Sequence, residues 1–234
     1  MGWVYEVENP LFAEAKDGIQ ISKSDEDPPW IVVYDQLSDV LPAEWPGRLW
    51  EVRVVRRLEP QGHIGSYTRA LSIQIIREDA PNRLFGQNGG AVEGVIAAAQ
   101  KLSVKHCKLL SLKRSPSAGE IYSEGWKRWL KQTDPDSGSN DDDFEGVLGI
   151  SGQGLRSPIG AGLTLINRYV NETARKKAGD SAFEDDEGEL WLNEPWSSAE
   201  SALLEAALAF GASNLFNEGE ADLLLGPWNE LIRQ

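Results

Sequence analysis

The sequence predicts an α+β protein, in which an antiparallel sheet from the N-terminal half packs with helices that come mostly from the C-terminal half. Two observations support this class. In residues 49–57 and 67–76, apolar side chains recur at every second position, which is typical of strands with one buried face. After residue 91, apolar residues recur instead at spacings of three and four, which is typical of helices. Strands followed by helices favour an α+β architecture.

The predicted strands fall early in the chain. Short β-branched and aromatic runs, bounded by turn residues, predict strands at residues 2–7, 19–21 and 30–34. Residues 49–57 and 67–76 predict an antiparallel hairpin, because both runs alternate and a Gly-containing segment connects them. The outward face of this hairpin would carry Arg53, Arg57 and Arg69.

The predicted helices follow, with two further strands among them. Apolar spacing predicts helices at 91–102, 120–131, 158–178, 197–210 and a short one from about 227. Residues 104–112 and 144–150 are interpreted as strands. Ser197 and Glu200 fit a capping box at the start of one helix, and Gly179 is expected to end another.

Size and composition indicate an ordinary globular chain. The 234 residues are 41% hydrophobic and 26% charged, so global disorder is not expected. We expect one α+β domain over residues 1–234, with a possible subdomain boundary in the acidic loop 133–143.

Cysteine usage and the N-terminus predict a cytoplasmic location. Cys107 is the only cysteine, so no intrachain disulfide can form. The first residues lack the basic and apolar regions of a signal peptide, and no apolar run reaches the roughly 18 residues of a membrane span.

The charge favours one kind of partner. A net charge of −14 argues against a bare nucleic-acid binder and against an anionic membrane surface. Residues 48–131 carry a net charge of +8, whereas residues 1–47 carry −8 and residues 132–234 carry −14. The three segments either compensate one another or present separate acidic and basic faces.

Two acidic runs are the candidate partner-binding residues. They comprise Asp134, Asp136, Asp141, Asp142, Asp143, Glu184, Asp185, Asp186, Glu187 and Glu189. Such runs speed the encounter with a basic protein through electrostatic steering, and aromatic residues, including nine Trp, can supply anchors.

An alternative set would bind an anion. Glycine-rich loops before helices can hold phosphate, because free N–H groups point outward there. This set comprises Arg53, Arg57, Arg69, Gly89, Gly90, Gly152 and Gly154. Neither glycine loop has a complete dinucleotide or P-loop pattern, so tight turning alone would also explain the glycines.

No pattern in the sequence indicates a catalytic centre, a metal site or a cofactor. His63, His106 and Cys107 are the only His and Cys residues, fewer than a closed zinc site needs. Cys107 is interpreted as a small core residue.

Three functions therefore stand as hypotheses. The favoured one is an acidic cytoplasmic interaction protein, of the inhibitor or immunity type, that binds and neutralises a basic partner such as a nuclease toxin. The second is an enzyme or binding protein for a phosphorylated or nucleotide ligand. The third is a structural subunit that buries Trp-rich surfaces in an assembly. The oligomeric state is left open.

Overall fold

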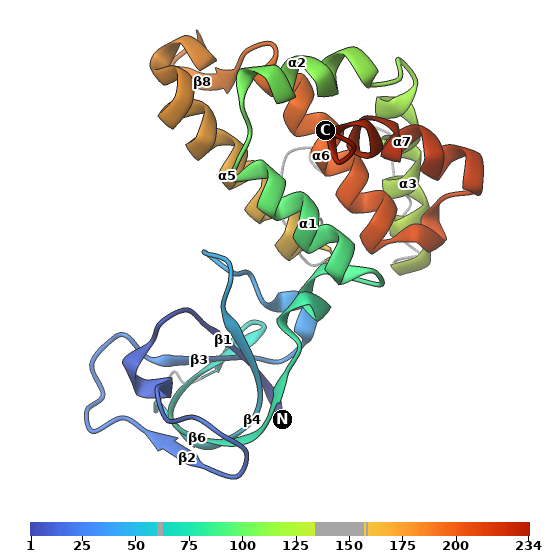
Figure 1. Ribbon diagram of the computed structural model, residues 1–234. Helices are drawn as coiled ribbons and strands as arrows, with labels where there is room; N and C mark the ends of the chain where they lie inside the picture. Colours follow the sequence, from blue (N-terminus) through green and yellow to red (C-terminus); the bar gives the residue numbers. More distant parts are fainter. Residues whose placement is uncertain (60–62, 134–156, 158) are drawn as a thin grey trace. The chain divides into compact units, whose positions relative to one another are not determined.

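A computed structural model describes residues 1–59, 63–133, 157 and 159–234 (Figure 1). It confirms the predicted class, because an antiparallel sheet is built from N-terminal strands and the helices lie mostly in the C-terminal half. By internal contacts the chain forms two compact units, a barrel unit, Met1–Leu84, and a helical unit, Phe85–Gln234. The predicted boundary loop, apart from Thr133 at the end of a helix, lies outside the described residues.

The barrel unit contains the strands that the alternating pattern predicts. Its strands are β1 (Gly2–Glu6), β2 (Gln20–Ser22), β3 (Ile31–Tyr34), β4 (Arg48–Arg57), β5 (His63–Ile64) and β6 (Tyr67–Asp79). Single 3-10 turns, η1 (Pro10–Phe12), η2 (Leu37–Asp39) and η3 (Pro81–Phe85), complete this part of the chain. The predicted hairpin is confirmed, since β4 and β6 pair antiparallel from Leu49↔Asp79 to Arg57↔Ala70.

The sheet closes on itself. β4 pairs with β1, β1 with β3, β3 with β6, and β6 again with β4, all antiparallel. Register shifts along the β4–β6 pair allow the long strand β6 to bend, so that it pairs with β3 through residues 67–70 and with β4 through residues 70–79. The result is the small ring of strands visible in Figure 1.

Apolar side chains from the alternating positions fill this ring. Trp50, Val52, Ile73 and Ile75 are fully buried, as the alternation predicts, and Val54 is partly buried against them. The Trp50 ring stacks on Phe12 from η1, at 6.5 Å between centroids. Glu51, by contrast, lies on the outside and accepts a hydrogen bond from Arg77 at 2.7 Å.

The helical unit is arranged around one alanine-rich helix. Its helices are α1 (Gly89–Ala99), α2 (Val104–Lys113), α3 (Ala118–Thr133), α5 (Gly160–Ala178), α6 (Trp196–Gly211) and α7 (Glu218–Leu231), with 3-10 turns η6 (Gly179–Ala182) and η7 (Ser213–Leu215). α6 contacts α1, α2, α3, α5 and α7. Its buried small residues allow these neighbours to approach closely; they include Ala199, Ala202, Ala206 and Ala207. None of the described helices is long and apolar enough to cross a membrane.

The predicted strand at 104–112 is wrong, because this segment is the helix α2. Cys107 and Leu110, three residues apart, are the buried positions, so helical spacing decides the structure. The hydroxyl of Ser103 caps the helix by accepting the His106 N–H at 3.2 Å. The predicted strand at 144–150 lies outside the described residues.

Two predicted helix starts are also wrong. Ser197 does not cap α6, which begins one residue earlier, and both Ser197 and Ser198 donate to the Glu194 carboxylate. The last helix begins at Glu218 rather than near Pro227, because Asn217 and Glu220 form the capping box there.

Candidate interaction surface

The second acidic run forms a β-hairpin that is anchored at its base. Strands β7 (Phe183–Asp186) and β8 (Glu189–Leu192) pair antiparallel between the end of α5 and the start of α6. Asn193 closes the base, because its backbone N–H donates to the Ala182 carbonyl at 2.9 Å and its amide donates to the Ser181 carbonyl at 2.7 Å. Ala182 is fully buried. The base is therefore held in the helical unit.

A two-residue turn connects the strands. Glu187 and Gly188 both have positive φ, 54° and 88°, which fits the twist of a tight hairpin. The Asp185 carboxylate accepts the Gly188 N–H at 2.8 Å. Gly188 adopts this conformation without strain, and Glu187 adopts a region that side chains other than glycine rarely occupy.

The pairing places acidic and aromatic residues on the same face. Glu184 pairs with Trp191, and Asp186 pairs with Glu189. Because cross-strand pairs and alternate residues share a face, these four side chains lie together. All four residues are exposed, Trp191 at 55%. They define what we call the acidic hairpin face, and Glu184, Asp186 and Trp191, together with Asp185, line an open hollow of about 370 Å³.

Within the described residues, the carboxylates of this face have no ion-pair partner. The nearest basic residues in sequence, Arg175, Lys176 and Lys177, end α5. The Arg175 guanidinium lies over the Phe183 ring, 4.7 Å from its centroid, rather than against a hairpin carboxylate. The negative charge of the face is therefore directed to solvent.

The other predicted partner-binding residues, Asp134, Asp136, Asp141, Asp142 and Asp143, lie outside the described residues. Sequence reasoning missed the exposed Trp191 and Leu190 beside the acidic run. The Glu187-Gly188 pair between two short runs is a turn signal that could have indicated the hairpin.

The alternative anion-binding residues are divided between the two units. Arg53 and Arg57 on β4 and Arg69 on β6 belong to the barrel unit, where Arg69 lies over the Trp30 ring at 4.4 Å. Gly89 and Gly90 begin α1 in the helical unit, with Gly89 buried. Gly152 and Gly154 lie outside the described residues.

The glycine loop before α1 has a packing explanation. Gly86 has a φ of 85°, and a Cβ added there would collide with the Gly211 carbonyl group at the end of α6. The neighbouring Gln87 N–H donates to that carbonyl at 2.8 Å. The glycine thus permits a close backbone contact between this loop and α6.

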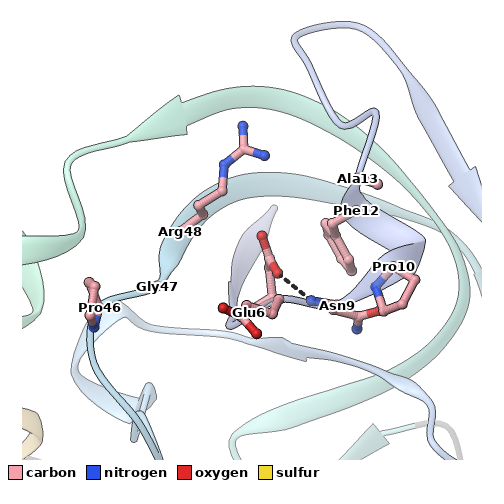
Figure 2. Close-up of a pocket in the computed structure, with 9 residues that line it drawn as sticks. Glu6, Asn9, Pro10, Phe12, Ala13, Pro46, Gly47 and Arg48 are labelled. Carbon is pink, nitrogen blue, oxygen red and sulfur yellow. Dashed lines mark hydrogen bonds between the residues drawn. The ribbon is translucent and has the colours of Figure 1, made fainter.

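The barrel unit has a hollow of about 460 Å³ that contains opposite charges (Figure 2). Glu6, which is 8% exposed, accepts the Asn9 N–H at 3.0 Å. The Arg48 guanidinium donates twice to Glu78, at 2.9 and 3.0 Å, and lies 4.3 Å from the Trp50 ring centroid. The hydrogen bond from Arg48 lowers the pKa of Glu78. Glu6 and Arg48 therefore already have partners within the barrel.

Two separate polar contacts join the helices of the helical unit. Glu205 on α6 is 2% exposed and binds Arg114, with the shortest contact at 2.5 Å. One turn earlier, Glu200 accepts the Asn167 amide at 2.9 Å. Burial raises the pKa of Glu200 to about 7, against the opposing effect of this hydrogen bond. Sequence reasoning missed these contacts, although Glu205 interrupts the otherwise apolar run 202–209.

The structure places Cys107 in the core, as predicted. It is fully buried, and this burial raises the pKa of its thiol to about 12. In the described ranges, no group of three His, Cys, Asp or Glu side chains could hold a metal ion.

Comparisons with protein families, curated proteins and solved structures give no match to this chain.

Proposed function

We propose that the chain is an acidic interaction protein that binds a basic protein partner through the acidic hairpin face. The single observation that supports this function is the exposed hairpin itself, in which unpaired carboxylates surround an exposed tryptophan. Carboxylates without counter-ions attract a basic surface over a distance of about 10 Å at moderate salt. A large exposed aromatic residue supplies the short-range contact that holds the complex.

The anchoring of the hairpin is consistent with this role. Its base is fixed by Asn193 and by the buried Ala182, whereas the strands above the base are exposed. A preorganised surface loses less conformational entropy on binding than a flexible segment would. Neutralising a basic toxin, such as a nuclease, is one biological role that this chemistry would serve.

The test compares two variants that remove the same amount of charge. Glu184→Gln with Glu189→Gln changes the acidic hairpin face, and Glu218→Gln with Asp222→Asn changes two exposed carboxylates of α7. A basic protein captured from the host lysate by the unaltered chain is purified, and its association rate is measured at 50 and 500 mM salt.

We expect the hairpin variant to associate about three- to tenfold more slowly at low salt, with the difference shrinking at high salt. The α7 variant should associate nearly as fast as the unaltered chain. Equal slowing by both variants would attribute the effect to net charge and would reject the hairpin as the contact surface.

A further inference from the structure

The acidic hairpin face contains an aromatic ring whose surroundings differ from those of the other partly exposed tryptophans. Trp191, at 55%, is the only tryptophan among the described residues that is exposed rather than buried or partly buried. The partly exposed tryptophans each have a partner. Arg69 lies over Trp30, and Arg83 lies 5.5 Å from the Trp3 ring centroid. Trp45 stacks on Tyr5, and Trp129 packs edge-on against Trp126. In the described part of the molecule, no arginine, lysine or ring contact covers Trp191.

Carboxylates stand beside this open ring. Glu184 is the cross-strand partner of Trp191, and Glu189 lies two residues away on the same strand and the same face. Asp186 completes the face opposite Glu189. An aromatic ring attracts a cation through its negative face, and a carboxylate attracts a cation through its charge. Both features thus favour the same kind of ligand.

We propose that the acidic hairpin face binds an arginine side chain of the basic partner, with the guanidinium stacked on Trp191 and hydrogen-bonded to Glu184 or Glu189. Arginine fits better than lysine, because its planar guanidinium stacks on an indole ring and can donate two parallel hydrogen bonds to one carboxylate. The proposal rests on the proposed function, since it names the group of the partner that the face recognises.

The open hollow of about 370 Å³ is compatible with this ligand. Glu184, Asp186 and Trp191 line it, so a guanidinium that enters it meets charge and ring together. Leu190, on the opposite face, is also exposed and does not belong to the arginine site.

The experiment uses the full chain and short peptides as probes. Hexaarginine, hexalysine and hexacitrulline are titrated while NMR follows the indole N–H signal of Trp191, which the spectrum of Trp191→Phe assigns. Citrulline has nearly the shape of arginine without its charge. We expect hexaarginine to move the Trp191 signal, hexalysine to bind more weakly with a smaller shift, and hexacitrulline to leave the signal in place.

Three variants separate stacking from charge. Trp191→Leu should weaken the binding of hexaarginine about two- to fivefold and remove most of the preference of the protein for hexaarginine over hexalysine. Trp191→Phe should retain much of that preference, because it keeps an aromatic face. Glu184→Gln with Glu189→Gln should weaken the binding of both hexaarginine and hexalysine. Because the hairpin is exposed, these variants are expected to fold, and the backbone amide spectrum checks this.

A Trp191 signal unmoved by saturating hexaarginine, or an arginine preference unchanged in Trp191→Leu, would overturn the arginine site. The two proposals can fail separately. If binding of the native partner requires the hairpin carboxylates but not Trp191, the interaction function is retained and the arginine site is rejected. If the hairpin binds hexaarginine but no native partner depends on the hairpin, the arginine site is retained and the interaction function is rejected.

Discussion

Glu200 should make the stability of the helical unit depend on pH. Its carboxylate accepts amide hydrogens from Asn167 and Asn171 on α5, at 2.9 and 3.4 Å. Burial raises its pKa from 4.5 to about 7, so the folded state favours the protonated form. A raised folded-state pKa contributes stability that is fully present below pH 4.5 and is lost as the pH rises through 7.

The magnitude follows from the shift. A rise of the pKa from 4.5 to about 7 corresponds to about 3 kcal/mol of unfolding free energy. Glu200 is half-buried, and solvent screening lowers the expected value to about 2 kcal/mol. Glu200→Gln imitates the protonated carboxyl, since the glutamine oxygen can still accept the Asn167 amide. It should leave stability nearly unchanged at pH 4.5 and raise it by about 2 kcal/mol at pH 8.

The assay is urea unfolding followed by circular dichroism at 222 nm, which reports the helices, at pH 4.5, 6 and 8. Asp222→Asn, on an exposed site of α7, is the control and should show the same pH dependence as the unaltered chain. Glu205, whose pKa burial also raises, is present in every variant, so its contribution cancels in the comparison. A difference between Glu200→Gln and the unaltered chain that stays constant from pH 4.5 to 8 would refute the reasoning.

Two further predictions concern single side chains. Cys107 is fully buried, and burial raises the pKa of its thiol to about 12. A disulfide reagent at pH 8 should therefore label Cys107 no faster than the helical unit opens. Stoichiometric labelling within seconds of mixing would contradict this expectation. Glu220→Gln should cost about 1 kcal/mol, because it weakens the Arg128 ion pair and the capping box at Asn217. These bonds lower the pKa of Glu220 to about 2, so the stabilisation by its carboxylate is present above pH 4.5 and is lost as the pH falls through 2. Urea unfolding should therefore show a smaller difference in unfolding free energy between Glu220→Gln and the unaltered chain at pH 2.5 than at pH 6. The same difference at both pH values would argue against this role of Glu220.

The sequence allowed the local elements to be predicted where burial imposes a period. Strand β4 was predictable because Trp50 and Val52 alternate with polar residues, and α5 because Leu163, Ile166 and Val170 share one face. The closure of the ring was not predictable, because the pairing of β6 with β3 depends on contacts distant in sequence.

The candidate site was predictable in part. The acidic run 184–189 was identified from charge alone, yet its strands were missed, since exposed carboxylates conceal the period of two. The exposure of Trp191 was unpredictable for a physical reason: a tryptophan beside apolar residues is more often buried, as Trp196 is. The polar contacts of Glu200 depend on how α5 and α6 pack, which the local pattern does not specify.

The position of β6 in the ring has a consequence for how the protein is made. β2, β3, β4 and β5 all pair with β6, and β6 is the last strand of the barrel unit to be synthesised. On the ribosome, residues 1–66 therefore emerge with most of their hydrogen-bond partners still to come. The barrel can close only once residue 79 has left the exit tunnel. A translational pause after β6 has emerged would give the barrel time to form, whereas a pause with β6 still inside the tunnel would leave the strand edges open to other chains.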